Sequence, residues 1–230
     1  MIALTNCKAV TISDGILEHA TILIEDGVIK AVGQEVEIPL DAEVIDLTGK
    51  WVTPGLIDAH SHLAMGEPGA RGGGDDDNEA VDPVTAHVRM IDSLDPWSIG
   101  IPEARKAGFT VMCSLPGSAN VIGGTGVAVK LKDANSVLDL VIPGTEVMKM
   151  ALGENPKGCY GEMKRMPMTR MGIGAVLRET LFNAKQYADE MEEAEKEGKP
   201  FKHNFKLDPL ATSAWLYIPV RPTATPVKTP

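Results

Sequence analysis

Short apolar runs separated by turn residues fill the first fifty residues and predict a small β-sheet. Residues 21–25 and 28–32 are predicted to be two strands joined by Asp26-Gly27, a dipeptide that favours a hairpin turn. Another strand is predicted around residues 43–47. Because fifty residues of short strands cannot bury both faces of a sheet, we expect this piece to pack against something else.

After Pro54-Gly55 the pattern changes, and apolar runs alternate with possible helices. Four of these runs are predicted to be strands, at residues 56–63, 110–115, 127–131 and 147–152. Alternation of this kind is typical of an α/β architecture with parallel strands. Between the first two strands lies a Gly- and Asp-rich segment, residues 71–78, which we expect to form a mobile active-site loop.

From Thr169 the chain has the pattern of one long helix. Thr169 suits the N-cap position, and apolar residues recur at helical spacing at Leu177, Leu181, Ala184, Ala188 and Met191. The charge run at residues 189–197 is interpreted as a solvated helix end. Residues 209–230 differ in kind, with five prolines and only two charged residues, so we predict an unstructured tail.

The acidic charge balance argues against several classes of partner. Lys and Arg number 22 against 32 Asp and Glu, which gives a net charge of −10 and a pI near 5.0. Phosphate binding needs clustered positive charge, and aromatic residues for base stacking make up only 4% of the chain. We therefore expect no nucleic-acid partner and no membrane partner.

The cysteines and the N-terminus indicate a compartment. Cys7, Cys113 and Cys159 are odd in number and widely separated, with no CxxC pair, which suits a reducing environment. The N-terminus lacks the pattern of a signal peptide, and no apolar run is long enough to span a membrane. The expectation is a soluble cytoplasmic protein.

The sharpest chemical signal is the pair His60 and His62, which follows Pro54-Gly55 and an apolar strand. Residues two apart in a strand point the same way, so both imidazoles project to one face. Placed at the end of a strand, two imidazoles can bind one divalent ion. A pair of solvent-facing histidines is the alternative, and the preceding Pro-Gly and apolar strand favour the metal site.

Two other segments have simpler interpretations. Gly123-Gly124-Thr125-Gly126 lacks the Lys-Ser/Thr of a phosphate loop and precedes a predicted strand, so a tight turn is preferred. Asp75-Asp76-Asp77 lacks the Gly and the final Glu of a calcium-binding EF-hand loop. Neither segment changes the hypothesis of a metal site at His60 and His62.

The segment Pro54-Gly55-Leu56-Ile57-Asp58-Ala59-His60-Ser61-His62 resembles the first-strand metal motif of the amidohydrolase superfamily. The residues before it, ending at 47–53, resemble the small β-sandwich that flanks the barrel in that family. Further matches lie at residues 116–124, 149–157, 169–172 and 177–179. The pattern is similar to amidohydrolases grouped with imidazolonepropionase and the metal-dependent dipeptidases, and it covers roughly residues 1–206.

The resemblance implies an α/β fold, namely a partial (β/α)₈ TIM-like barrel with a small N-terminal β-sandwich domain. It places the β-sandwich at residues 1–52 and the partial barrel at 53–206. The remaining residues, 207–230, are expected from their composition to be a disordered or aberrant tail. It also implies hydrolysis of a C–N bond other than an ordinary peptide bond, in an amide, cyclic amide or dipeptide, by metal-activated water. A small-molecule substrate and a possible homo-oligomer are expected.

The family's metal ligands carry over onto few positions of this chain. His60 and His62 match directly, and either Lys149, as a carboxylated lysine, or Glu154 could supply the oxygen ligand; the sequence leaves both open. Zinc is the first choice of divalent metal, although Mn²⁺, Fe²⁺ and Ni²⁺ suit the same donors. The family also needs two later histidines and a last-strand aspartate.

The remaining histidines, His19, His87 and His203, do not lie at apolar strand ends. His87 lies in a predicted helix at 84–94, and all three are interpreted as surface or packing residues. The codons that encode residues 222–229 permit a His-Cys-His run in another reading frame, so the chain is predicted to be C-terminally truncated or frameshifted. The alternative to a hydrolase is therefore a non-catalytic truncated fragment or a metal-binding half-module.

Overall fold

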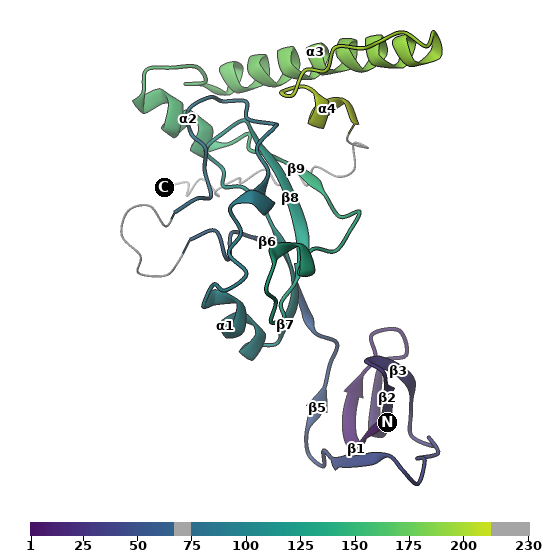
Figure 1. Cartoon of the computed structure of the whole chain (residues 1–230). Helices are drawn as coiled ribbons and strands as arrows, with labels where there is room; N and C mark the ends of the chain where they lie inside the picture. Colours follow the sequence, from purple (N-terminus) through teal and green to yellow (C-terminus); the bar gives the residue numbers. More distant parts are fainter. Residues whose placement is uncertain (67–74, 213–230) are drawn as a thin grey trace. The chain divides into compact units, whose positions relative to one another are not determined.

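The computed structural model describes residues 1–66 and 75–212 of the chain, drawn in colour in Figure 1. These residues form two compact units that divide between Gly55 and Leu56, and the second unit contains all the candidate metal ligands. No helix of the described residues is both long and apolar enough to cross a lipid bilayer.

The first unit is a five-stranded sheet in the order β3-β2-β1-β4, with β5 also paired to β1. Its strands are β1 (Ile2–Val10), β2 (Ile16–Glu25), β3 (Val28–Gly33), β4 (Glu43–Asp46) and β5 (Trp51–Val52). Alternate residues of β1 are buried because side chains along a strand point to opposite faces. The predicted hairpin is confirmed, since β2 and β3 pair antiparallel across Asp26 and Gly27, which both have positive φ.

The second unit contains a four-stranded sheet in the order β6-β7-β8-β9. The strands are β6 (Leu56–Ser61), β7 (Phe109–Ser114), β8 (Ile122–Lys130) and β9 (Val147–Met150), so all four predicted strands are present. β6 and β7 are parallel, but β8 runs antiparallel to both of its neighbours. The prediction of parallel strands is wrong for β8, because residues 115–121 are too few for the crossover that a parallel pair needs.

The segment before β8 departs from prediction as well. Residues 84–94 do not form the predicted helix; only Met90–Asp92 makes a turn of 3₁₀-helix, η1. Val84 and Arg89 instead form isolated parallel bridges to β8, and the Thr85 amide donates to the Ile122 carbonyl at 2.8 Å. The backbone groups that a helix would use are therefore bonded to β8.

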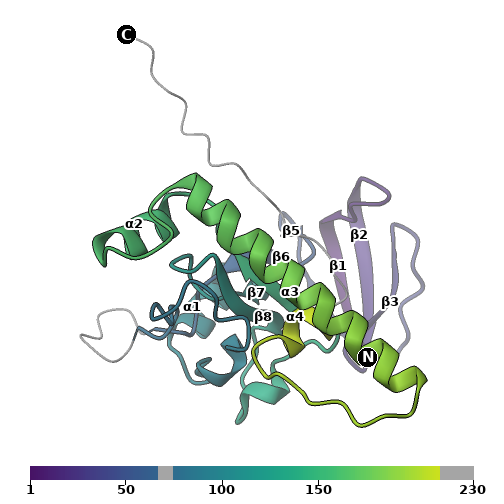
Figure 2. The same ribbon diagram turned by 90° about the horizontal axis from the view of Figure 1, so that it is seen from above.

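Four α-helices accompany this sheet: α1 (Gly100–Lys106), α2 (Glu154–Glu162), α3 (Arg170–Lys196) and α4 (Asp208–Thr212), together with a second 3₁₀ turn, η2 (Val137–Asp139). The predicted N-cap of α3 is confirmed, because the Thr169 hydroxyl accepts a hydrogen bond from the Gly172 amide at 3.0 Å. Figure 2 shows α3 crossing the unit with α4 beside it. Ile173 and Val176 of α3 pack with Ile122 of β8 in a buried cluster.

The end of the described chain is more ordered than predicted. The tail was expected to begin at residue 207, but Asp208–Thr212 form α4, and Leu210 is buried in the cluster beneath α3. Burial of the Leu210 side chain stabilises the packing of α4 against this cluster. Residues 213–230 of the predicted tail, and residues 71–74 of the predicted active-site loop, lie outside the described residues.

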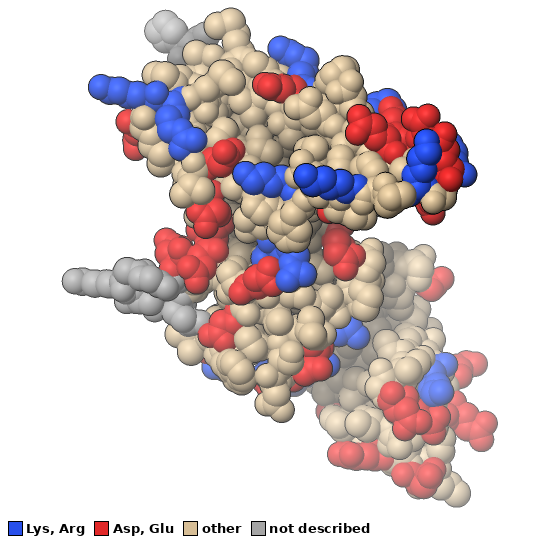
Figure 3. Space-filling model, turned by 45° about the horizontal axis from the view of Figure 1, so that its top comes forward, with Lys and Arg blue, Asp and Glu red and all other residues tan. Residues whose placement is uncertain are grey.

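The charge run at the end of α3 is a solvated helix end, as predicted. Acidic and basic side chains are intermixed there in Figure 3, and Lys185 and Lys196 form ion pairs with Asp189 and Glu192 one turn away. All four side chains are more than half exposed, so each pair contributes at most about 1 kcal/mol. Solvent exposure and ion pairs within the helix account for this charge run.

Gly124 is the tightest position in β8, and its replacement by alanine is expected to destabilise the fold by about 2 kcal/mol. Its φ of +113° disfavours side chains, and a Cβ there would lie 2.3 Å from the Val88 carbonyl oxygen. Gly158→Ala in α2 is the control, because a Cβ there meets nothing within 4 Å and alanine favours helix. Urea denaturation of both variants tests this; equal stability would contradict the steric argument.

Candidate metal centre

His60 and His62 lie at the end of β6, with their ring centroids 5.4 Å apart in an edge-to-face arrangement. The His62 Nδ1 atom lies 2.7 Å from the Leu115 carbonyl oxygen. A carbonyl can only accept a hydrogen bond, so this contact places the proton on Nδ1 and leaves the Nε2 lone pair of His62 free. Fixing one ring nitrogen in this way is the usual preparation of a metal-ligating histidine.

Lys149 reaches the histidine pair from β9, at the other edge of the sheet. Its side chain is buried, with 7% of the residue exposed, and its Nζ atom lies 3.4 Å from His60 Nε2. The ammonium also donates to the Pro116 carbonyl at 2.9 Å and to the Ser118 hydroxyl at 3.3 Å. The loop between β7 and β8 therefore supplies the remaining walls of the cluster.

Burial and neighbouring charges lower the pKa values of Lys149 and His60 in this cluster. Burial lowers the pKa of Lys149, and the negative charge of Asp77 partly opposes that shift. The pKa of His60 is also lowered, first by burial and then by the neighbouring charges of Lys149 and His62, with Asp58 acting the other way. Both groups therefore spend more of their time neutral, which is the state in which an imidazole or an amine has a lone pair to offer.

Glu154 is not brought to this cluster. It begins α2, where its exposed carboxylate forms an ion pair with Lys157 at 3.0 Å. Within residues 1–66 and 75–212, no three His, Cys, Asp or Glu side chains are grouped so that they could hold a metal ion. The geometry thus unites His60, His62 and Lys149, two imidazoles and an amine that could become an oxygen ligand by carboxylation.

The other histidines lie elsewhere. His19 is exposed on β2, and the exposed His203 lies 3.1 Å from Asp208. His87 lies in the segment that bridges to β8, with its ring beside Phe205 and with a buried Nδ1 atom that has no hydrogen-bond partner among the described residues. None of the three adds a ligand to the cluster of His60, His62 and Lys149.

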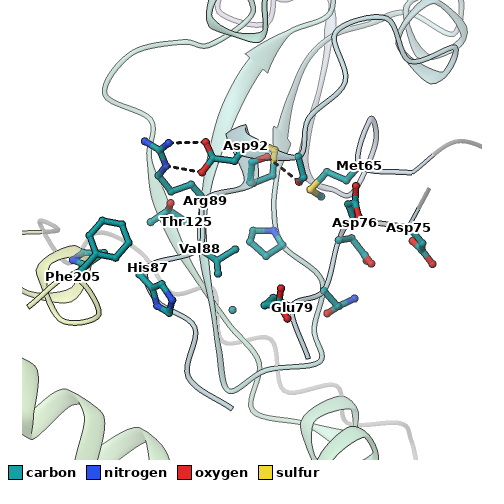
Figure 4. Close-up of a pocket in the computed structure, with 17 residues that line it drawn as sticks. Met65, Asp75, Asp76, Glu79, His87, Val88, Arg89, Asp92, Thr125 and Phe205 are labelled. Atoms are coloured by element: carbon teal, nitrogen blue, oxygen red, sulfur yellow. Dashed lines mark hydrogen bonds and ion pairs between the residues drawn. The ribbon is translucent and has the colours of Figure 1, made fainter. Parts of the chain in front are cut away.

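A pocket with a volume of about 730 Å³ adjoins the cluster, and Pro116, whose carbonyl binds Lys149, forms part of its wall. Figure 4 shows Asp75 and Asp76 on the side opposite Phe205, with the ion pair of Arg89 and Asp92 between them. The described part of the Gly- and Asp-rich segment thus lines a cavity. The full lining comprises Met65, Asp75, Asp76, Asp77, Asn78, Glu79, His87, Val88, Arg89, Met90, Asp92, Ser93, Pro116, Gly123, Thr125, Phe205 and Pro209.

Pro116 and Ser118 are parts of the site that were not predicted from the sequence. Both belong to the run Pro116-Gly117-Ser118-Ala119-Asn120, for which no secondary structure and no contact was predicted. The usable signal was the match of residues 116–124 to the family pattern, which covered this loop without assigning a role to any residue in it.

Comparison with known proteins gives matches along most of the chain. Residues 1–52 match the NagA composite domain. The amidohydrolase tasK of Hapsidospora irregularis is 35% identical over 178 residues, which are 72% of this chain and 18% of tasK. A dihydroorotase of Anaeromyxobacter dehalogenans is 32% identical over 63% of this chain and 28% of its own length. An imidazolonepropionase of Vibrio cholerae is 46% identical over 26% of this chain and 16% of its own length.

A solved structure, the amidohydrolase from Thermotoga maritima MSB8, superimposes with a TM-score of 0.85 and 38% sequence identity. The match covers 91% of this chain and 54% of that one. The chain therefore spans about half the length of this solved relative and less than a third of the three curated relatives. The match confirms the predicted fold class, a partial TIM-like barrel with a small N-terminal β-sandwich domain.

Proposed function

Because this chain belongs to the amidohydrolase superfamily, we propose that it carries the metal-binding half of a hydrolase that cleaves C–N bonds. The proposed substrates are small molecules with an amide, cyclic amide or dipeptide bond, in keeping with relatives named amidohydrolase, imidazolonepropionase and dihydroorotase. The observation that carries the proposal is the 3.4 Å approach of the buried Lys149 amine to His60 Nε2. A metal site of this kind needs the imidazole and the lysine side chain close together, and this approach places them so.

The residues fit a divalent metal, with zinc as the first choice. His60 and His62 would bind it through imidazole nitrogens, and His62 is already oriented by the Leu115 carbonyl. Lys149 would contribute an oxygen after its neutral amine reacts with CO₂ to form a carbamate. When bound, a divalent ion polarises a carbonyl oxygen and lowers the pKa of water. Glu154 remains the alternative oxygen ligand, but it would first have to leave its ion pair with Lys157.

The pocket beside the cluster supports a small-molecule substrate, because about 730 Å³ lies within the range of small-molecule sites. Its wall would orient the scissile bond, and the residues around Pro116 would shield the cluster from bulk water. The acidic surface supports the further proposal that neither nucleic acid nor a membrane is a partner. Assembly into a homo-oligomer also remains a proposal.

A second candidate is a metal-binding half-module that hydrolyses nothing until another polypeptide supplies the later ligands, or a fragment without catalysis. The observation in its favour is that the described residues unite only His60, His62 and Lys149, while the solved relative is nearly twice as long as the matched region. Both candidates bind metal, and they differ in turnover by the chain alone.

Zinc bound per chain, measured by elemental analysis after dialysis, tests the metal site. The wild-type chain is expected to retain zinc, and His60→Ala and His62→Ala are each expected to lose most of it, because each variant lacks one of the two proposed imidazole ligands. His203→Ala is the matched control, since this exposed histidine lies outside the cluster. Equal zinc content in all four proteins would refute the site.

The same preparations should then be screened against amides, cyclic amides and dipeptides. Zinc-dependent turnover that His60→Ala abolishes supports the hydrolase and contradicts the half-module. Zinc binding by the wild-type chain without turnover of any substrate class would favour the half-module.

A further inference from the structure

The Ser118 hydroxyl is a partner of Lys149 to which the proposed function assigns no role. It lies 3.3 Å from Nζ, on the same loop as the Pro116 carbonyl at 2.9 Å. Toward an ammonium group both oxygens act as acceptors. They differ in one respect, since a carbonyl can only accept a hydrogen bond and a hydroxyl can also donate one.

Ser118 is held in place by the loop around it. The Gly117 amide donates to the Asp77 carbonyl at 2.6 Å, and the Ala119 amide donates to the Asn78 side-chain oxygen at 2.8 Å. A Cβ at Gly117 would lie 2.1 Å from the Asn78 side chain, so only glycine allows this approach. Hydrogen bonds therefore hold the backbone on both sides of Ser118, and this backbone places the Ser118 hydroxyl beside Lys149.

The proposed carboxylation changes what Lys149 needs from these neighbours. The neutral amine attacks CO₂, a new N–C bond forms, and one amine proton leaves to solvent, so that a carbamate with one N–H and two oxygens results. The Pro116 carbonyl can accept from the remaining N–H. The new anionic oxygens need hydrogen-bond donors. Among the described residues, Nζ has His60, the Pro116 carbonyl and the Ser118 hydroxyl as hydrogen-bond partners, and of the two that are not proposed metal ligands the hydroxyl can donate as well as accept.

We propose that Ser118 is a positioning residue that stabilises the carboxylated form of Lys149 by donating its hydroxyl proton to a carbamate oxygen. This inference rests on the proposed function and adds a residue to it. Ser118 does not touch the substrate; it acts by holding Lys149 in its ligating form and orientation. Its loss should therefore change how readily CO₂ adds to Lys149, which can be measured without any catalytic assay.

The experiment uses the full chain with one equivalent of Zn²⁺ and ¹³C-labelled bicarbonate, and it follows the carbamate carbon by ¹³C NMR. Wild type should give a carbamate signal that Lys149→Ala lacks. Ser118→Ala should need about tenfold more bicarbonate for half-maximal signal, the change expected from losing one hydrogen bond to a charged group. Ser118→Gly provides a second variant without the hydroxyl, with folding checked by circular dichroism, and Ser118→Thr should restore the wild-type titration.

Ser136→Ala is the matched control, because the Ser136 hydroxyl accepts a hydrogen bond from the Leu138 amide at 3.3 Å at the start of η2, and Ser136 is neither in the cluster nor among the residues that line the pocket. It should titrate like wild type. If a folded Ser118→Ala or Ser118→Gly chain reached its half-maximal carbamate signal at the same bicarbonate concentration as wild type, the role of Ser118 would be overturned. The proposed function would be left intact. A wild-type chain with no Lys149-dependent signal would overturn the lysine ligand itself, and the role of Ser118 with it.

Discussion

A Lys149→Met chain is expected to bind zinc at least about 100-fold more weakly than wild type, with only a small change in folding stability. Loss of a residue that merely orients a metal ligand costs about 10- to 100-fold in affinity, so loss of a ligand should cost no less. Stability should change little because two effects oppose each other. Methionine removes the penalty of burying the amine, but it leaves the Pro116 carbonyl without its donor, and each effect is worth about 1–3 kcal/mol.

Chelator competition measures the zinc affinity, and urea denaturation measures the stability of the same preparations. Lys157→Met is the matched control, since that lysine forms an ion pair with the exposed Glu154, outside the cluster, and its replacement should leave zinc affinity unchanged. If Lys157→Met strengthened zinc binding, by releasing Glu154 from its ion pair, and Lys149→Met had no effect, Glu154 would be the oxygen ligand. Unchanged affinity in both variants would leave the histidine pair as the whole site.

The lowered pKa of Lys149 predicts a second difference between wild type and Lys149→Met, in how folding stability depends on pH. Between the lowered folded-state pKa and the unfolded value of 10.5, the unfolded chain binds more protons at this position than the folded chain. Wild-type stability should therefore rise with pH across that window, relative to Lys149→Met, which has no group to titrate there. A stability difference that fell with rising pH would show that the folded state prefers the charged lysine.

Local pattern was sufficient to predict much of the fold and part of the site. The strands β6 to β9 follow from short apolar runs, and the side-by-side placement of His60 and His62 follows from the period of a strand. The contact between Lys149 and His60 joins residues 89 positions apart. It depends on the order β6-β7-β8-β9, which no local pattern contains, and only the family resemblance pointed to Lys149.

Two of the wrong predictions share a physical cause, since both concerned segments whose partners are remote in the sequence. Residues 84–94 were assigned to a helix, yet the backbone of Thr85 and Val88 is bonded to Ile122 and Thr125 of β8. The glycines predicted to form a turn before β8 lie inside that strand, where Gly124 lets the Val88 carbonyl approach. Tertiary pairing decided both segments, and pairing is not encoded in the period of either one.

Tyr160→Ala is expected to be the most destabilising substitution, by about 3–5 kcal/mol. Tyr160 is fully buried near the end of α2, and its hydroxyl donates to the Asn120 side-chain oxygen at 2.5 Å. Asn120 lies in the metal-site loop, residues 115–121 between β7 and β8, and it donates in turn to the Glu79 carbonyl and the Thr85 hydroxyl. One tyrosine therefore joins α2 to this loop and, through Asn120, to the segment that contains Glu79 and Thr85. The substitution would leave a large cavity and an unpaired buried oxygen together.

Two further variants separate these causes. Tyr160→Phe keeps the ring and should lose about 1–3 kcal/mol, the cost of leaving the Asn120 oxygen unpaired. Phe182→Ala removes an aromatic ring that is 63% exposed and should change stability by no more than about 0.5 kcal/mol. Urea denaturation of all three gives the ranking, and a Phe182→Ala loss as large as that of Tyr160→Ala would contradict the assignment of the core.

Alkaline titration provides an independent measurement on the same tyrosine. Burial raises the pKa of Tyr160 to about 12, above the ordinary value of 10.0. Between these values the unfolded tyrosine releases its proton while the folded one keeps it, so the folded chain binds more protons and its stability must fall as pH rises. Wild type should thus lose stability between about pH 10 and 12, and Tyr160→Phe should lose less, because phenylalanine has no proton to release. Identical slopes for the two chains would mean that the Tyr160 hydroxyl is accessible to solvent, and the link from α2 through Asn120 to the metal-site loop would then have to be abandoned.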